Sequence, residues 1–336
     1  MPRPRSAAPA TGATRVAVVG AATVEGGKLR EALARRGVPG GRVHLYGTER
    51  GEAVLGEYGG EARLIQEPDL DEIAGQDVVF LCEFSAVADR LVKLPGRKAT
   101  VIDLTGRSLA GALARLVHRI TAPGTAEERG GLLATPHPIA AVLAEVLHPV
   151  HRSIGISEVV AVVLRPASDF GEPGIEELRE QTARLLRFEK APREIFGRQL
   201  AFNLIPQRLL AGAEEGLERR IAREVAELLG WAEDRLAIRL VAAPVFMGHA
   251  LSLRLKLARD AGLEALSEAI GAAGKANRPG REPAETPLAA PEERRTDVSE
   301  VVEDGIGGFW VWAIAGDVGA EAAEQAVLAA EAVVGL

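Results

Sequence analysis

Residues 16–37 read VAVVGAATVEGGKLREALARRG: an apolar run, a turn that contains glycine, and a helical pattern. The apolar run predicts a buried strand, and Leu29 and Leu33 repeat at the spacing of one helix face. Further strands are predicted at residues 42–47, 77–84 and 99–106. Helical patterns lie between and after them, at SAVADRLVKL and SLAGALARLVHRI. Since strands that alternate with helices form a parallel sheet with right-handed crossovers, this part predicts a nucleotide-binding α/β domain.

The turn GAATVEG (20–26) follows a strand and opens a helix, which is the context of a dinucleotide-binding fingerprint. In such a turn, backbone N–H groups and the helix N-terminus hold a pyrophosphate. Gly20 and Gly26 occupy the first and last glycine positions. Thr23 stands at the middle one, where a Cβ should crowd the ligand. Two interpretations stay open: a cofactor turn, or a turn that kept the fold and lost the cofactor.

The chain changes in character after Ala134. The long β-rich runs at 156–168 and 235–257, with helical patterns between them, predict a mixed or antiparallel sheet. Residues 275–297 are rich in proline and charge and are expected to be a surface loop. A last strand at 307–317 precedes a helix that could pack back on the first domain. The predicted fold class is therefore α/β followed by α+β.

Three segments are predicted from this pattern. They are a disordered tail at 1–14, a Rossmann-like domain at 15–134 together with 317–336, and a second domain at 135–316.

The composition is that of a globular protein, with 47% hydrophobic and 26% charged residues among 336. The net charge of −7 disfavours nucleic acid as a partner, and no apolar run is long enough to span a bilayer. The single cysteine, Cys82, excludes an internal disulfide framework and a cysteine-based zinc cluster. It reads as a small buried hydrophobe, consistent with a cytoplasmic location.

The histidines outside the second β-rich run predict no metal site. His148 and His151 form HPVH, whereas a metal pair on a helix needs i,i+4 spacing without proline between its members. His137 lies between two prolines in TPHPIA and is expected to form a structural turn rather than a nucleophile.

Several motifs occur in order along nearly the whole chain: VAVVGAATVEG, VIDLTG, GIEELREQTARLL, FGRQLAFNLIPQ, PVFMGH and FWVWAIAGD. In these motifs the chain resembles the aspartate-semialdehyde dehydrogenase family. The resemblance implies a homodimer of two-domain subunits, with a Rossmann domain and an α+β domain that carries catalysis and the dimer interface. It also implies the reduction of aspartyl phosphate, or the reverse reaction, with NADPH and a cysteine thioester.

Three catalytic positions of that family hold other residues here. The family's nucleophilic cysteine falls on Pro138, which has no nucleophilic atom. The glutamine that orients the substrate falls on Arg165, and the arginine that clamps its carboxylate falls on Ala242. Alanine cannot make the bidentate bond that this position needs. The pattern is similar to that of the Usg-type paralogues, which keep the fold and lack the cysteine.

Other positions of the family are kept, changed conservatively or lost. His249 matches the acid/base histidine, and Glu218 and Arg220 fall where the family has a substrate-binding glutamate and lysine. A nicotinamide-side asparagine falls on Val318. The resemblance assigns cofactor binding to a larger set: Gly20, Ala21, Ala22, Thr23, Val24, Glu25, Gly26, Thr48, Arg50 and Ser168.

The cofactor is left open at the end of the second strand. Glu49 would repel a 2′-phosphate and Arg50 would attract one. We expect NADP binding to be possible but weakened, and NAD to be less favoured. Arg165 could bind an anion, or it could pair with Asp169 or Glu172.

Three functions are compatible with these residues. The first is a non-catalytic homodimer, which could also form a heterodimer with an active paralogue. The second is an active NADP-dependent aspartate-semialdehyde dehydrogenase, which would need a nucleophile elsewhere, such as Cys82. The third is an oxidoreductase without a covalent step, in which His249 serves as the acid/base.

Overall fold

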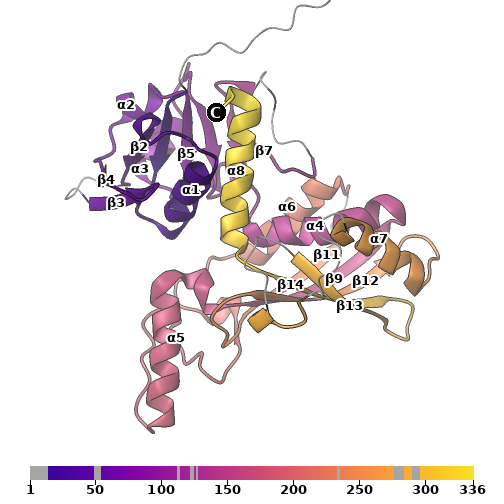
Figure 1. Cartoon of the computed structure of the whole chain (residues 1–336). Coiled ribbons are helices and arrows are strands. Elements are labelled where there is room, and N and C mark those ends of the chain that lie inside the picture. Colours follow the sequence, from indigo (N-terminus) through magenta and orange to yellow (C-terminus); the bar gives the residue numbers. More distant parts are fainter. Residues whose placement is uncertain are drawn as a thin grey trace, which may run out of the picture. The chain divides into compact units, whose positions relative to one another are not determined.

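The computed structural model describes residues 14–48, 54–111, 114–121, 125, 128–232, 235–275, 284–289 and 296–336. The predicted N-terminal tail, apart from its last residue, and Arg50 lie outside them. The chain divides into two compact units, Met1–Thr135 with Ala322–Leu336, and Pro136–Glu321 (Figure 1). The two units are described separately below.

Six parallel strands form the main sheet of the first unit, in the order β2-β1-β5-β6-β8-β7. They are β1 (Val16–Val19), β2 (Val43–Tyr46), β5 (Val78–Leu81), β6 (Thr100–Asp103), β7 (Arg115–Leu116) and β8 (Leu132–Ala134). Its helices are α1 (Val24–Arg35), α2 (Leu70–Ala74) and α3 (Ala86–Val92). The predicted parallel α/β domain is confirmed. The chain order reverses between β1 and β5, which is where such sheets bind ligands.

The C-terminal helix α8 (Val318–Val334) packs on this sheet from residue 322 onward. Ala326 and Val327 share one buried cluster with Val16 and Leu29. At the surface, the Arg36 guanidinium lies 3.2 Å from Glu324 and 2.9 Å from Glu331 of the same helix. The predicted return of this helix to the first domain is confirmed.

The prediction of a helix at SLAGALARLVHRI is wrong. That segment forms a short 3-10 turn at Arg107–Gly111 and then the edge strand β7, which pairs with β8. Asp103 explains the turn, because its carboxylate accepts hydrogen bonds from the backbone and side chains of Thr105 and Ser108. The hairpin β3 (Val54–Tyr58) and β4 (Glu61–Ile65) was not predicted.

The second unit is built on a mixed sheet in the order β10-β11-β9-β12-β14-β13. The strands are β9 (Ile156–Arg165), β10 (Ile205–Pro206), β11 (Leu236–Ala242), β12 (His249–Leu257), β13 (Thr296–Glu303) and β14 (Phe309–Ala315). β9 runs parallel to β11 and antiparallel to β12, so the predicted mixed sheet is confirmed. Of the predicted loop at 275–297, the part within 284–289 carries a single 3-10 turn, and the described strand β13 begins at Thr296.

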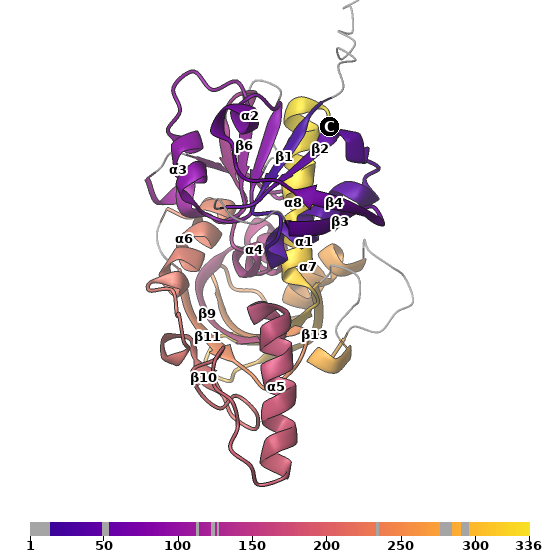
Figure 2. The same ribbon diagram turned by 90° about the vertical axis from the view of Figure 1, so that its left-hand side faces the viewer.

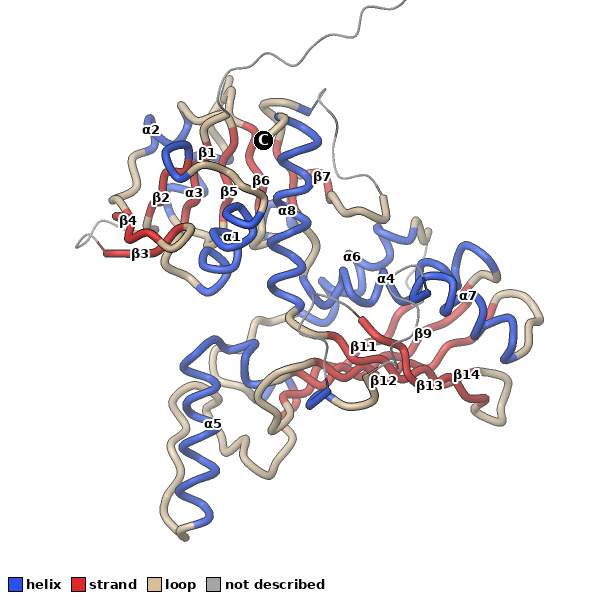
Figure 3. Tube along the Cα trace, viewed as in Figure 1, coloured by secondary structure: helices blue, strands red, loops and turns tan. Residues whose placement is uncertain are grey.

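Three helices cover one face of this sheet: α4 (Pro138–Ser153), α6 (Leu217–Leu229) and α7 (Leu263–Lys275) (Figure 3). Along β9, Val159, Ala161 and Val163 are fully buried on that side, while Val160 and Val162 between them are only half-buried. This period of two follows from the alternation of side chains along a strand. The helix α5 (Gly171–Leu186) extends on the other side of the sheet (Figure 2). No described helix is long and apolar enough to cross a membrane.

Candidate functional site

The glycine turn of the first unit uses most of its own N–H groups. Those of Gly20 and Ala21 donate to the Tyr46 carbonyl, and that of Thr23 donates to the Gly20 carbonyl. Thr23 is the N-cap of α1, and its hydroxyl accepts from the Gly26 N–H at 3.1 Å. The N–H groups of Val24 and Glu25 belong to the first turn of α1, where N–H groups have no partner within the helix.

The two outer glycines of this turn are needed for the fold itself. Gly20 has φ +82°, and a Cβ on Gly26 would lie 2.2 Å from the Gly20 carbonyl oxygen. These positions therefore fit a close strand–helix junction whether or not a dinucleotide binds. The turn alone is weak support for a cofactor.

The first unit has a pocket of about 500 Å³, and the residues that line it include Thr48, Ser85 and Arg90. The carboxylates of Asp69, Asp71 and Glu83 also line it. A 2′-phosphate would meet these anions, with Arg90 as the cation among the lining residues that the structure describes. Arg50, which could add a second cation, lies outside the described residues.

Cys82 does not offer a relocated nucleophile. It is buried, and burial together with the nearby carboxylates Glu25 and Asp103 raises the pKa of its thiol well above the ordinary range. Since the thiolate is the reactive form, this cysteine is expected to be inert. The structural role predicted for it agrees with this environment.

In the second unit, the predicted nucleophile position begins a helix. Pro138 is the first residue of α4, where its missing N–H costs nothing. His137 is the N-cap, and its Nδ1 accepts a hydrogen bond from the Ile139 N–H at 3.1 Å. The segment therefore starts a helix, with no thiol or hydroxyl at the helix start.

The environment of His137 keeps its imidazole neutral. Burial, with the neighbouring cations Arg220 and Arg165, lowers the pKa of His137 to about 3. The capping hydrogen bond also favours the neutral imidazole, because Nδ1 can accept a hydrogen bond only while it is unprotonated.

Arg165 is held by three neighbours. Its Nε donates to Asp169 Oδ2 at 2.7 Å, its Nη1 donates to Gln207 Oε1 at 2.6 Å, and its guanidinium lies over the Phe170 ring at 5.0 Å. The side chain is 11% exposed. Of the alternatives for Arg165, the pair with Asp169 is the one that the structure contains.

Asp169 also reaches the predicted acid/base. Its Oδ1 lies 2.9 Å from His249 Nε2, and His249 is 3% exposed. Burial acts to raise the pKa of Asp169, but His249 and Arg165 together hold it well below its usual range. Both ring nitrogens of His249 are buried, and the close contact of Nε2 with Asp169 is an ion-pair distance that is not aligned as a hydrogen bond. The three side chains form an internal cluster, which we call the Arg165–Asp169–His249 cluster.

Ala242, at the predicted clamp position, is fully buried. It pairs with Arg165 in the neighbouring strand β9 and with Ile205 in β10, and it belongs to the apolar cluster around Phe196. Ser168, a predicted cofactor contact, donates its N–H to the Phe246 carbonyl at 3.0 Å. Val318, at the nicotinamide-side position, begins α8.

Glu224 was not predicted from the sequence to belong to the site. Its Oε2 accepts the His137 N–H at 2.6 Å, and Oε1 lies 3.9 Å from Arg220 Nε. Burial raises the pKa of Glu224 to about 7. The sequence pattern could have revealed this residue. Glu224 follows Ile221 by three residues, so it places a carboxyl group on the apolar, buried face of α6.

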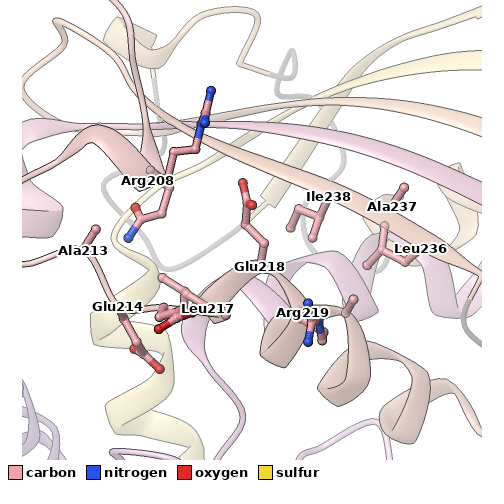
Figure 4. A pocket seen from close by; sticks show the side chains of 13 residues that line it. Arg208, Ala213, Glu214, Leu217, Glu218, Arg219, Leu236, Ala237 and Ile238 are labelled. Atoms are coloured by element: carbon pink, nitrogen blue, oxygen red, sulfur yellow. The ribbon is translucent and has the colours of Figure 1, made fainter.

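Glu218 takes part in strand-edge hydrogen bonding. Its Oε1 accepts the Leu240 N–H at 2.8 Å, and its Oε2 lies 3.4 Å from Arg239 Nη1. Figure 4 shows its side chain between Arg208 and Ile238 in a pocket of about 590 Å³. Arg220 does not line this pocket, so Glu218 and Arg220 do not share it.

No described group of three or more metal-ligating side chains could hold an ion. His151 accepts a hydrogen bond from the Trp231 indole at 3.2 Å and meets its ring edge-on, which gives this histidine a packing role.

Several known proteins are similar to this chain in sequence. Residues 147–313 match the semialdehyde dehydrogenase, dimerisation domain. A USG-1 protein homolog from Pseudomonas aeruginosa is 29% identical over 261 residues, which are 76% of this chain and 78% of that protein. An aspartate-semialdehyde dehydrogenase from a Synechocystis species is 25% identical over 262 residues, 77% of this chain and 78% of that protein.

Solved structures share the fold over most of the chain. A probable aspartate-semialdehyde dehydrogenase from Pseudomonas aeruginosa has a TM-score of 0.76 and 27% identity, over 95% of this chain and 97% of that one. The Candida albicans enzyme, solved with NADP, has a TM-score of 0.65 and 16% identity, over 95% of this chain and 98% of that one. Residues 147–313 thus carry a semialdehyde dehydrogenase dimerisation domain. The chain as a whole is similar in sequence and fold to aspartate-semialdehyde dehydrogenases and to USG-1 homologs.

Proposed function

We propose that this protein is a Usg-type member of the family that no longer carries out the family's reaction and acts as a non-catalytic homodimer. The observation that carries the proposal is Pro138 at the first position of α4. Covalent catalysis needs a thiol there, and neither Pro138 nor its capping neighbour His137 supplies one.

The Arg165–Asp169–His249 cluster supports the same conclusion. The Arg165 guanidinium donates a hydrogen bond to Asp169, and the His249 imidazole lies 2.9 Å from the same carboxylate. Ala242 is buried in the apolar core and cannot bind a carboxylate. Three chemical requirements of the reaction are therefore unmet in a single chain.

Cofactor binding is proposed to survive only in weakened form, with NADP ahead of NAD. The family resemblance supports NADP, while Thr23 and the acidic lining of the neighbouring pocket oppose tight binding. The matched dimerisation domain supports a homodimer, and the same domain would serve the proposed heterodimer with an active paralogue. The single buried cysteine is compatible with a cytoplasmic protein.

The test is an assay of the purified protein with aspartate semialdehyde, phosphate and NADP, followed by NADPH absorbance, with His249→Ala as the matched control. Mass spectrometry of protein quenched during the reaction detects an acyl adduct. We expect no turnover above the control and no adduct. Turnover that His249→Ala abolishes, or an adduct on Cys82, would overturn the proposal.

A second candidate is an oxidoreductase without a covalent step. It is favoured by one observation: Asp169 orients His249 at 2.9 Å, as a carboxylate orients a general base. It requires dinucleotide binding, so calorimetry with NAD and NADP tests it directly. Absence of binding at millimolar concentration excludes this candidate and leaves the non-catalytic protein.

A further inference from the structure

The first half of β11 has a free edge in the second unit. The Val159 N–H of β9 donates to the Arg235 carbonyl, so alternate residues from Arg235 onward bond to β9. Leu236 and Ile238 lie between them and direct their N–H and C=O groups to the other side of the strand. On that side, β10 pairs only with the last two residues of β11. Within the part of the chain that the structure describes, the earlier backbone groups have no neighbouring strand.

One outward N–H of β11 is satisfied by a side chain instead of a strand. The Leu240 N–H donates to Glu218 Oε1 at 2.8 Å, just before the residues that pair with β10. The same edge continues to Ile238 and Leu236, which line the pocket of about 590 Å³. Because a free edge readily pairs with another chain, natural sheets usually block it. Here the edge opens into a cavity, and we call the two together the β11 edge groove.

The β11 edge groove has room for an extended chain. Figure 4 shows Leu236, Ala237 and Ile238 on one side of it and Leu217 and Arg219 of α6 on another. Its volume lies within the range of about 300–1,000 Å³ that is usual for ligand sites. A strand added to a sheet lies about 4.8 Å from its neighbour and rises about 3.3 Å per residue. The free edge can therefore pair with a segment of about three or four residues.

The unpaired charges of the lining are mainly positive. Arg208 and Arg219 are exposed, and the described residues supply no ion-pair partner for either of them. Two of the three lining carboxylates, Glu214 and Glu218, already accept hydrogen bonds from this chain. Glu215 is thus the one carboxylate of the described lining that stands without a partner against the two guanidinium groups. The first turn of α6 also lines the groove, and a helix N-terminus favours an anion.

The groove is separate from the Arg165–Asp169–His249 cluster. Arg165 pairs with Ala242 at the end of β11, and Leu236 at the start of this strand lies about 20 Å away along it. The residues of the cluster do not line the pocket. A ligand in the groove therefore occupies a different place from the substrate positions that the family resemblance implies.

We propose that the β11 edge groove binds an extended acidic segment of a partner protein, which adds to β11 as a new strand. The backbone of the segment pairs with the outward N–H and C=O groups of Leu236 and Ile238. Its acidic side chains face Arg208 and Arg219. In this mode of binding the main-chain hydrogen bonds give affinity and the side chains give specificity. The binding activity goes beyond the proposed homodimer and does not depend on it.

The experiment uses the full chain and a library of random heptapeptides displayed on phage. Enriched peptides are synthesised with acetylated and amidated ends, and fluorescence polarisation measures their affinity. We expect them to be acidic. Arg208→Glu and Arg219→Glu are each expected to raise the dissociation constant at least about tenfold, because each removes a charge-assisted hydrogen bond. Arg223→Glu, at an exposed position of α6 outside the groove, is the matched control and leaves the affinity unchanged.

Methylation of the peptide backbone tests the added strand itself. In a strand that pairs along one edge, alternate amides face the partner strand and the amides between them face away. N-methyl groups on the amides that face β11 remove its hydrogen bonds and are expected to abolish binding. The same number of methyl groups on the other amides is the control and should leave the affinity nearly unchanged.

Each outcome decides for or against the groove. The inference is overturned if no peptide is enriched, or if enriched peptides bind the wild type, Arg208→Glu and Arg219→Glu equally well. Equal effects of the two methylation patterns overturn strand addition. Dissociation of the homodimer by saturating peptide, seen in sedimentation equilibrium, would assign the groove to a second copy of this chain and overturn the inference as well. None of these measurements depends on turnover, so the proposed loss of the reaction is tested separately.

Discussion

Asp169 Oδ1 lies 2.9 Å from His249 Nε2, and the second oxygen of this carboxylate accepts a hydrogen bond from Arg165. One buried anion thus serves two basic side chains. In the family, the matching positions face a substrate. Here Asp169 contacts both basic groups, and we expect these contacts to contribute to the stability of the second unit.

The first prediction concerns the loss of that anion. Asp169→Asn should lower the free energy of unfolding by about 3 kcal/mol, because it leaves the buried Arg165 guanidinium without a counter-charge. Urea unfolding followed by circular dichroism measures the change. Asp89→Asn, in the surface pair with Lys93, is the control and should cost less than about 1 kcal/mol. Equal effects of the two variants would contradict a structural role for the cluster.

Glu224 predicts a pH dependence of stability. Its pKa is raised to about 7 by burial, so the folded state binds this proton more tightly than the unfolded state. The resulting stabilisation is complete below about pH 4.5, falls as the pH rises, and is lost above about pH 7. A shift of this size corresponds to roughly 3 kcal/mol.

Glu224→Gln measures that contribution, since the amide oxygen can still accept the His137 N–H. Relative to the wild type, the variant should gain stability between pH 4.5 and pH 7 and stay constant above it. Thermal or urea unfolding at several pH values tests this. The solvent-exposed Glu176→Gln is the control. A wild-type-to-variant difference that does not change with pH would contradict the raised pKa.

His137 should contribute to stability in the opposite direction. Its pKa is lowered to about 3, so its contribution is present above the unfolded value near 6.5 and is lost as the pH falls toward 3. His137→Asn keeps a capping acceptor without a titrating group and should remove this loss. His137→Ala also removes the cap and should cost about 1 kcal/mol at neutral pH. If the His137→Asn and His137→Ala variants have the same free energy of unfolding at pH 7, the capping hydrogen bond to Nδ1 does not stabilise the protein.

The sequence was enough for the fold and for only part of the site. The alternation of strands and helices predicted both sheets, because buried parallel strands have a strong apolar signal. The helix prediction for SLAGALARLVHRI failed because two interactions outweigh the helical spacing of its apolar residues. They are the pairing of β7 with β8 and the hydrogen bonds of Asp103. The Asp169–His249 contact joins groups 80 positions apart, and the Glu224–His137 bond joins groups 87 apart. No local pattern encodes such pairs.

Restoring a thiol should not restore the reaction. In a Cys82→Ser background, Pro138→Cys places a thiol at the first turn of the 16-residue helix α4. The helix N-terminus should lower its pKa below the ordinary value of about 8.5 and make it alkylate readily. Turnover should stay absent, since Ala242 offers no clamp and Arg165 is bonded to Asp169. Iodoacetamide rates against pH measure the first claim, and appearance of dehydrogenase activity would refute the second.

Thr23 predicts a gain of dinucleotide affinity on removal of its side chain. Thr23→Gly frees the Gly26 N–H, which now donates to the threonine hydroxyl at 3.1 Å, and clears the Cβ from the turn. One hydrogen bond from this N–H to a charged phosphate should tighten NADP binding about tenfold. The helix should lose only a few tenths of a kcal/mol, because glycine is an acceptable N-cap. Thr23→Ser keeps the cap and should bind like the wild type in calorimetry. If both variants bind equally, the side chain of Thr23 does not limit the affinity, and the acidic pocket around Glu83 becomes the barrier to remove next.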